Sequence, residues 1–301
     1  MSVSQPQKQQ MAGQAAVLVT AFLWSTSGLL IKLLPWNPMV ITGLRSFFAA
    51  VFILIVRLIV PPPKGTKNPP LPLIAGAIAY VLTMYTFVIA NKLTTAANAI
   101  MLQYSAPAWA ALLGWLLIRE KPHWEHWGAL ALIAGGLFLF FTDSSGLGAG
   151  ALTGDALALF SGVTLGANSV FLRMQKEGNP RDSMLLAHAI SAVISVPFIF
   201  LYPPSLSVPS VLTILYMGFF QIGLASVLFA YGLTKISAVQ AMLIAILEAI
   251  LNPIWVLAIN GEKPTPRALA GGLIIIGAVV ASSLIGKRRE DLAAAKGIAG
   301  S

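Results

Sequence analysis

Residues 72–91, PLIAGAIAYVLTMYTFVIAN, form a stretch of twenty residues without a charged side chain. An α-helix rises about 1.5 Å per residue, so a helix of this length spans the roughly 30 Å hydrocarbon core of a lipid bilayer. A helix satisfies its backbone hydrogen bonds internally, as the bilayer interior requires because it contains no water. The stretch therefore predicts a transmembrane helix.

Comparable apolar stretches recur along the 301 residues of the chain, of which 57% are hydrophobic and 10% are charged. Soluble domains carry roughly a quarter charged residues, so this composition excludes a soluble enzyme. Clusters of Pro and Gly separate the stretches and predict loops. We expect an all-α integral membrane protein with ten transmembrane helices, near residues 13–33, 39–60, 72–91, 95–118, 126–142, 152–173, 182–202, 209–232, 237–259 and 266–286.

The chain lacks the residue patterns on which ATP hydrolysis, metal binding and much of catalysis depend. It contains no Cys, no Gly-x-x-x-x-Gly-Lys-Ser/Thr run and no His-Glu-x-x-His motif. We therefore expect no enzyme, no cofactor and no bound metal. An intramembrane enzyme or a non-transporting membrane protein stays open as a less favoured alternative.

Lys and Arg residues indicate the orientation, because cytoplasmic loops carry an excess of them. If the amino terminus is cytoplasmic, 14 of the 19 Lys and Arg residues fall on the inner side, four fall on the outer side, and Arg45 lies within a span. We expect both termini to be cytoplasmic, in the bacterial inner membrane. The net charge of +9 is then a topology signal, and we expect no nucleic-acid partner.

Two short motifs repeat at an offset of 142 residues. Asn37-Pro38 matches Asn179-Pro180, and Glu120-Lys121-Pro122 matches Glu262-Lys263-Pro264. Each half would contain five spans, and an odd number forces the second half to cross the membrane in the opposite sense. Inverted repeats of this kind are typical of secondary transporters, whose substrate site lies near the bilayer midplane between the halves.

We expect the first five-helix repeat at residues 1–142, the second at 152–286, and a basic cytoplasmic tail at 287–301. Pro107 and Pro253 occupy similar places in the two repeats, but at an offset of 146 residues. That difference predicts about one extra helical turn in one half. The pair is a candidate hinge, because a Pro inside a transmembrane helix can kink it.

Several motifs occur in an order that resembles the EamA-type carriers of the drug/metabolite transporter superfamily. They are Leu23-Trp24-Ser25-Thr26-Ser27-Gly28 with Lys32, Pro38 with Leu44-Arg45, Pro107, Glu120 and Glu262. The resemblance covers nearly the whole chain and implies a ten-helix carrier with a central cavity that works by alternating access. Trp-Ser-Thr in the first helix resembles the aromatic amino-acid exporters most, although residues 165–168 lack the further Trp expected there.

We single out three ionisable residues within the predicted spans, because charge is costly inside a bilayer and marks functional sites there. Glu248 lies midway along its helix, where it could bind a substrate ammonium group, take up a proton, or pair with Arg45. Arg45 could contact substrate, or it could extend towards the outer surface. His188 could relay protons or act as a buried interhelical donor.

Aromatic and amide side chains near the middle of several helices predict a pocket for a flat apolar group with a polar end. Ordinary packing is the alternative for each of them. The predicted substrate-binding residues are Trp24, Tyr80, Asn98, Tyr104, Asn168, Gln240, Glu248 and Trp255, and Gln103, Trp109 and Asn252 belong to the same set.

The sequence thus favours a secondary active or facilitative carrier that exports amino acids, aromatic and other apolar ones above all, or related small metabolites. A carrier for another solute, such as a drug, a nucleobase or a sugar derivative, is the alternative. Sugar phosphates are disfavoured, since only Arg45 offers a buried cation. The expected partners are this small-molecule substrate and the lipid bilayer, and the carrier could be a monomer or a homodimer.

The inverted arrangement makes a prediction about Lys121 and Lys263, which follow the same motif in the two halves. Accessibility mapping with an impermeant reagent is expected to place Lys121 on the cytoplasmic face and Lys263 on the outer face. Labelling of both positions from one face would contradict the inverted repeat.

Overall fold

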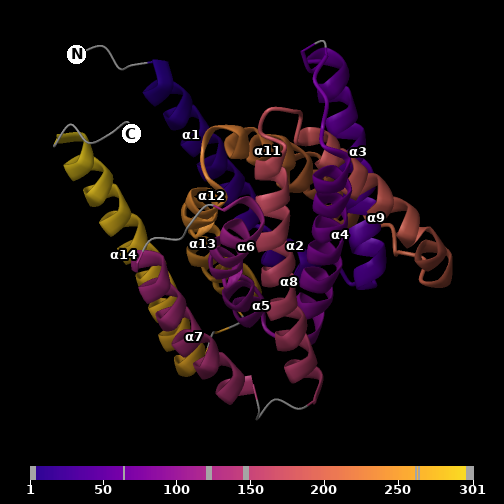
Figure 1. Ribbon diagram of the computed structural model, residues 1–301. Helices are drawn as coiled ribbons and strands as arrows, with labels where there is room; N and C mark the ends of the chain where they lie inside the picture. The colour runs from indigo at the N-terminus through magenta and orange to yellow at the C-terminus, as the bar shows by residue number, and fades with distance from the viewer. Residues whose placement is uncertain are drawn as a thin grey trace.

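The computed structural model describes residues 5–63, 65–119, 124–144, 149–261, 263 and 265–295. Within these ranges the secondary structure consists of helices, and no strand occurs. The helices of the first half are α1 (Gln5–Ser25), α2 (Ser27–Leu33), α3 (Pro38–Ile59), α4 (Pro70–Leu93), α5 (Ala96–Gln103), α6 (Ala106–Ile118) and α7 (Trp124–Ser144). They form one bundle with the helices of the second half (Figure 1).

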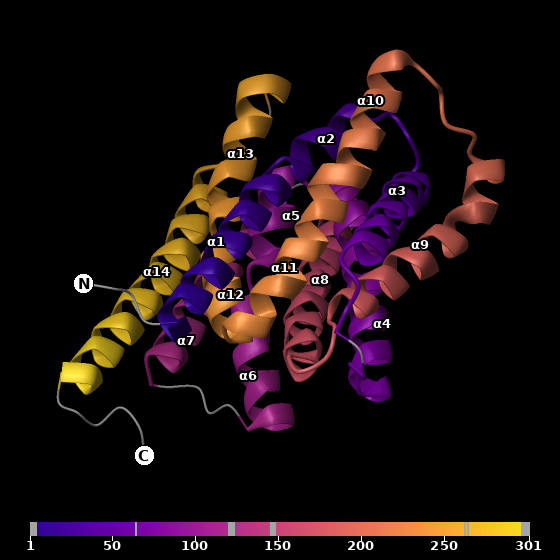
Figure 2. The same ribbon diagram turned by 90° about the horizontal axis from the view of Figure 1, so that it is seen from above.

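The second half begins with two long helices, continues with shorter, interrupted ones and ends with the long helix α14. Its helices are α8 (Ala149–Met174), α9 (Arg181–Leu201), α10 (Val208–Tyr216), the π-helical segment η1 (Met217–Leu224), α11 (Ala225–Lys235), α12 (Ala238–Ala245), α13 (Leu247–Asn260) and α14 (Pro266–Ala295). Helices α7 and α14 lie side by side at one edge of the bundle in both ribbon views (Figures 1 and 2).

Each of the ten predicted spans coincides with a helix or with consecutive helices. Among the described residues, eight helical stretches are long and apolar enough to cross a membrane. The predicted spans 126–142 and 266–286 fall on α7 and α14, in which shorter apolar stretches are described, Trp127–Gly136 and Leu269–Ser282. The predicted tail at 287–301 does not begin as a separate segment, because α14 continues to Ala295.

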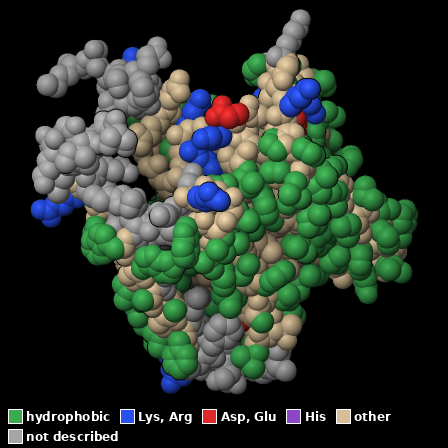
Figure 3. Space-filling view, in the orientation of Figure 1, with side chains coloured by type: hydrophobic (Ala, Val, Ile, Leu, Met, Phe, Trp, Pro, Cys, Tyr) green, Lys and Arg blue, Asp and Glu red, His purple; other side chains and the backbone are tan. Residues whose placement is uncertain are grey.

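The outer surface of the bundle matches a lipid environment. Apolar side chains form a broad band across the face in Figure 3, and several Lys and Arg side chains gather at the upper rim. Phe200 on α9, for example, is 80% exposed. Exposed apolar side chains over so large an area would be unstable in water but are favourable against lipid tails. The chain is therefore a multi-pass membrane protein.

Three of the predicted single spans are broken helices. The predicted span 13–33 is interrupted at Thr26, the span 95–118 between Gln103 and Ala106, and the span 237–259 at Ile246. A fourth, 209–232, passes through the π-helical segment η1. Hydropathy alone detects none of these interruptions, since the broken stretches are as apolar as continuous ones.

The interruption before α6 has a local cause in the sequence. Pro107 stands in the first turn of α6 and has no backbone N–H, so it cannot bond to the carbonyl of Gln103 four residues earlier. Gln103 is accordingly the last residue of α5. Helix α8 packs closely here, because a Cβ on Gly162 would lie 2.7 Å from the Gln103 carbonyl oxygen.

The N-terminal caps of α5 and α12 lie 142 residues apart, which is the offset of the repeated sequence motifs. The Thr95 hydroxyl accepts from the Asn98 N–H at 3.1 Å, and the Ser237 hydroxyl accepts from the Gln240 N–H at 3.2 Å. Both caps begin the short helix that precedes a break, and such caps satisfy N–H groups that a helix start leaves open.

The ends of these helix pairs keep the same offset. Arg119 after α6 and Gly261 after α13 both adopt the left-handed backbone conformation, with φ of 56° and 69°. The extra helical turn predicted from Pro107 and Pro253 is therefore wrong. Pro107 opens α6, whereas Pro253 lies inside α13, and the two are not at corresponding positions.

Parts of the repeated motifs lie outside the described residues. These are all of Glu120-Lys121-Pro122, together with Glu262 and Pro264 of the second copy.

Candidate functional site

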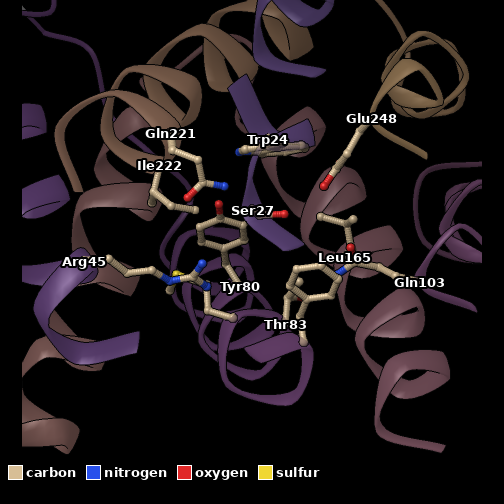
Figure 4. A pocket seen from close by; sticks show the side chains of 12 residues that line it. Trp24, Ser27, Arg45, Tyr80, Thr83, Gln103, Leu165, Gln221, Ile222 and Glu248 are labelled. Carbon is tan, nitrogen blue, oxygen red and sulfur yellow. The ribbon is translucent and has the colours of Figure 1, made fainter. Parts of the chain in front are cut away.

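A cavity lies at the centre of the bundle, between α1, α2, α3, α4, α5, α8, η1 and α13 (Figure 4). Twelve side chains line it: Trp24, Ser27, Arg45, Tyr80, Thr83, Met84, Phe87, Gln103, Leu165, Gln221, Ile222 and Glu248. The cavity is small, with a volume of about 40 Å³. That is room for a few waters, so a larger ligand requires the helices to move apart.

The interrupted helices meet at this cavity. Ser27 follows the break at Thr26, Gln103 precedes the break before α6, and Glu248 follows the break at Ile246. Gln221 and Ile222 come from the π-helical segment η1. Irregular backbone is tolerated at membrane depth where it lines a cavity, and broken helices mark the binding sites of many transporters.

Hydroxyl groups satisfy the backbone at the first break. The Ser25 hydroxyl donates to the Phe22 carbonyl at 2.6 Å, and the Thr26 hydroxyl donates to the Leu23 carbonyl at 2.9 Å. Such local hydrogen bonds replace those lost where a helix is interrupted. The Trp-Ser-Thr sequence thus has a structural role beside its place at the cavity, since it permits the break that brings Ser27 to the lining.

Tyr104 connects the breaks of the two halves. It stands between α5 and α6, and its hydroxyl lies within hydrogen-bond distance of the Ala245 carbonyl and, at 3.0 Å, of Glu248 Oε2. A hydroxyl carries one proton, and a carbonyl can only accept. The single Tyr104 proton is therefore donated either to the Ala245 carbonyl or to the Glu248 carboxylate.

Arg45 lines the opposite side of the cavity from Glu248, with the Tyr80 ring between them (Figure 4). Its side chain is only 2% exposed, so it does not extend towards the outer surface. Within the described ranges, no hydrogen bond or ion pair joins Arg45 to another residue, and its Nε is buried without an acceptor. The ion pair with Glu248 that the sequence left open is therefore not formed, because the cavity separates the two groups.

Two further polar atoms of the lining lack partners. Trp24 Nε1 is a buried donor, and Gln221 Oε1 is a buried acceptor in a residue that is 1% exposed. Leaving such a group unsatisfied costs about 1–3 kcal/mol. The Trp24 indole packs on Phe229 at 5.0 Å between ring centroids, so the ring is held while its N–H stays available to a ligand.

Of the predicted substrate-binding residues, the structure brings Trp24, Tyr80 and Glu248 to the cavity wall, and Tyr104 directly behind Glu248. Arg45 and Gln103 line it as well.

The other predicted residues do not line the cavity. The Asn168 amide donates to the Gly76 carbonyl at 2.9 Å, and Trp255 Nε1 donates to the Ser25 hydroxyl at 3.1 Å. Asn98 is buried near the start of α5, and Gln240 is half-buried in α12. These four residues hold helices together or lie at helix starts. Asn252 and Trp109 are also absent from the lining: the Asn252 amide on α13 donates to the Ser27 hydroxyl at 3.3 Å, and Trp109 lies on α6.

His188 lies behind the cavity wall. Its Nε2 is 3.0 Å from the Ser226 hydroxyl, and its ring packs edge-on against Tyr80 at 5.5 Å between centroids. The residue contacts a lining side chain without reaching the cavity itself.

Sequence reasoning missed Ser27, Thr83 and Gln221 at the cavity. Gln221 had a usable signal, since it is an amide in the middle of the predicted span 209–232. It also missed Asp155, an acidic residue inside the predicted span 152–173. Asp155 is buried and accepts from the Thr94 hydroxyl at 2.7 Å, at the end of α4 and away from the cavity.

Comparison with known proteins agrees with this architecture. A family model described as the EamA-like transporter family matches two segments, residues 11–142 and 152–284. The chain belongs to the EamA-like transporter family. The family match identifies it as a membrane transporter, in agreement with the multi-pass fold.

Two relatives resemble this EamA-like transporter over most of their length. An uncharacterized transporter, YwfM, of Bacillus subtilis (strain 168) is 28% identical over 286 residues, which cover 92% of this chain and 96% of the relative. An uncharacterized transporter of Archaeoglobus fulgidus is 24% identical over 269 residues, 89% and 95% of the two chains. A solved crystal structure shares the fold, with a TM-score of 0.69 at 18% identity over 93% of this chain and 99% of its own.

Tyr104 provides a test of the site that leaves its shape nearly unchanged. Tyr104→Phe removes the hydroxyl that contacts Glu248 and Ala245, and we expect substrate to bind about tenfold more weakly, since a hydrogen bond to a charged group contributes about 1.5–3 kcal/mol. Transport into liposomes at varied substrate concentration measures the change. The matched control is Tyr85→Phe, whose hydroxyl contacts the Ser191 carbonyl and Ser195; an equal loss in both variants would contradict a role of Tyr104 in the site.

Proposed function

We propose that this EamA-like transporter exports amino acids, with aromatic and other apolar amino acids favoured, across the bacterial inner membrane. The observation that supports the proposal is the lining of the cavity, in which an acidic and a basic side chain face a common space without pairing. An amino acid carries both complementary charges. The Trp24, Tyr80 and Phe87 rings offer apolar faces for its side chain.

Other solutes fit the lining less well. A cationic drug would be attracted by Glu248 and the aromatic rings but repelled by Arg45 in the same cavity. A phosphorylated sugar carries two negative charges, whereas Arg45 is the one basic residue of the lining. A neutral nucleobase would leave both charged groups unpaired, and buried unpaired charges are costly.

We infer that transport proceeds by alternating access between two inverted five-helix halves with ten membrane spans in all. The two family-model segments, residues 11–142 and 152–284, and the caps at an offset of 142 residues support this arrangement. The start of α1 and the end of α14 lie at the same end of the bundle (Figure 1). An even number of membrane crossings puts both ends on one side of the membrane, and the excess of Lys and Arg supports a cytoplasmic location for them.

The helix interruptions are the proposed hinges. The chain can bend at three interruptions: Thr26, the junction of α5 and α6, and Ile246. Bending there changes the width of the cavity without breaking the hydrogen bonds of a continuous helix. Pro107 contributes to one hinge by preventing a continuous helix there. Pro253 lies inside α13, seven residues after the break at Ile246, and would act by kinking α13 instead.

Purified protein in liposomes tests the proposed function. We expect labelled Phe, Trp, Thr or Met to cross faster than in protein-free liposomes, and Phe and Trp to be transported best. If none of the four crosses faster, the amino-acid substrate is wrong, and the same assay with drugs and nucleobases tests the alternative solutes.

Trp24→Ala tests the aromatic face in the same assay. We expect the apparent affinity for Phe to fall about tenfold, since an aromatic pair contributes about 0.5–1.5 kcal/mol beyond the burial of its area. Trp115→Ala is the matched control, because Trp115 is a partly exposed residue of α6 that packs on Trp127. Equal effects of the two substitutions would assign Trp24 to packing alone.

A further inference from the structure

Two polar atoms of the cavity wall point to a feature of the substrate beyond its charges. Gln221 Oε1 is a buried acceptor and Trp24 Nε1 is a buried donor, and neither has a partner among the described residues. The two residues are 1% and 5% exposed. Figure 4 shows both on the side of the cavity away from Glu248, with the nitrogen end of the Trp24 indole turned towards the Gln221 amide. A ligand in this cavity therefore meets a donor and an acceptor together.

The π-helical segment η1 determines which way Gln221 faces. Its backbone hydrogen bonds span five residues instead of four, so its side chains leave the positions that a continuous α-helix would give them. Two glycines let this wider segment pack closely on α3. A Cβ on Gly218 would overlap the Phe48 side chain. A Cβ on Gly223 would lie 3.3 Å from the Ala49 Cα. Since π-helical turns are rare and occur frequently at functional sites, η1 supports a functional role for Gln221.

Trp24 is held in place relative to Gln221. Its ring packs on Phe229 of α11 at 5.0 Å between centroids. One turn earlier on α1, the Thr20 hydroxyl lies 3.3 Å from the Ala225 carbonyl, at the start of α11. Helix α11 follows η1 without a gap, so the contacts that fix Trp24 also fix it against the segment that carries Gln221.

A hydroxyl group satisfies both atoms at once. It donates its proton and accepts through its oxygen, so one hydroxyl can bond to Gln221 and to Trp24 together. An indole N–H only donates and an ether oxygen only accepts, and each would leave one of the two atoms unsatisfied. A carboxamide offers both functions on separate atoms but lacks the flat apolar surface that the Tyr80 and Phe87 rings can contact.

We propose that the cavity selects an amino acid whose aromatic side chain ends in a hydroxyl group, which donates to Gln221 Oε1 and accepts from Trp24 Nε1. The proposal deepens the proposed amino-acid transport and rests on it. Arg45 and Glu248 serve the charged groups that all amino acids share, whereas Gln221 and Trp24 distinguish between side chains. A site built to bond a substrate hydroxyl rejects the analogue that lacks it, because the buried polar atoms of the site are then left unpaired.

Calorimetric binding to the purified full-length chain tests the proposal with three ligands that differ at one ring position. They are L-tyrosine, O-methyl-L-tyrosine, which accepts but does not donate, and L-phenylalanine, which does neither. We expect L-tyrosine to bind about tenfold or more tightly than either analogue. Binding of O-methyl-L-tyrosine as tight as that of L-tyrosine would contradict donation to Gln221.

Two substitutions assign the preference to its residues. Gln221→Met removes the amide at similar length and is expected to abolish the preference for L-tyrosine over L-phenylalanine. Trp24→Phe removes the N–H but keeps an aromatic ring, and it is expected to reduce the preference. Gln240→Met is the matched control and is expected to retain the preference, since Gln240 is half-buried in α12 and does not line the cavity. A packing role would weaken both ligands equally.

The outcomes separate this proposal from the proposed function. If L-phenylalanine crosses liposomes but the parent chain binds L-tyrosine no more tightly, or if both variants keep the full preference, hydroxyl selection is wrong and amino-acid transport stands. If the preference exists and Gln221→Met abolishes it, but neither amino acid crosses, the hydroxyl site stands and amino-acid transport is wrong. If none of the three ligands binds, both are overturned.

Discussion

A buried guanidinium group without a partner is the constraint on which the centre of this protein depends. Placing a charged side chain inside a bilayer is costly, and such residues face protein or a water-filled space. Arg45 faces the cavity, where a few waters or a ligand can solvate it. The cavity therefore has to exist for α3 to cross the membrane, and the helices around it have to leave room.

The broken helices provide that room. Continuous transmembrane helices pack closely along their whole length, whereas a break allows the two parts of a helix to diverge and presents polar groups to the space between them. Ser25 and Thr26 satisfy the backbone at the first break, and Tyr104 bonds to the Ala245 carbonyl at the third. Because Tyr104 lies at one break and Ala245 precedes another, this contact joins the two halves beside Glu248.

Much of the fold could be predicted from hydropathy, since every predicted span coincides with helical structure and the described Pro and Gly clusters lie between helices or at helix ends. The breaks were not predicted, because they depend on contacts between helices that are distant in sequence. Pro107 was recognised as a perturbing residue, but its effect, ending α5 at Gln103, was not. The break at Ile246 has no Pro or Gly within it to indicate its position.

The cavity was predicted in part. The energetic cost of placing a charge inside a bilayer identified Arg45 and Glu248 from the sequence. A position near the middle of a predicted helix identified Trp24 and Tyr80. All four residues line the cavity. The same arguments selected Asn168 and Trp255, whose polar atoms bond to neighbouring helices instead. Sequence can show that a polar group lies inside the membrane, but which helix face it occupies follows from packing. For this reason Gln221, in the π-helical segment, was missed.

The central claim is that Arg45 and Glu248 serve a ligand and contribute little to the stability of the fold. Buried charges retained for function can be replaced by apolar residues of similar volume at no cost to stability, and sometimes with a gain. The most direct measurement is the thermal unfolding midpoint of the Arg45→Met, Glu248→Leu double variant, with and without L-phenylalanine. The account predicts a midpoint at or above that of the parent chain and no further increase on adding L-phenylalanine, which raises the midpoint of the parent. A midpoint lowered by several degrees, or a ligand-induced increase equal to that of the parent, would contradict it.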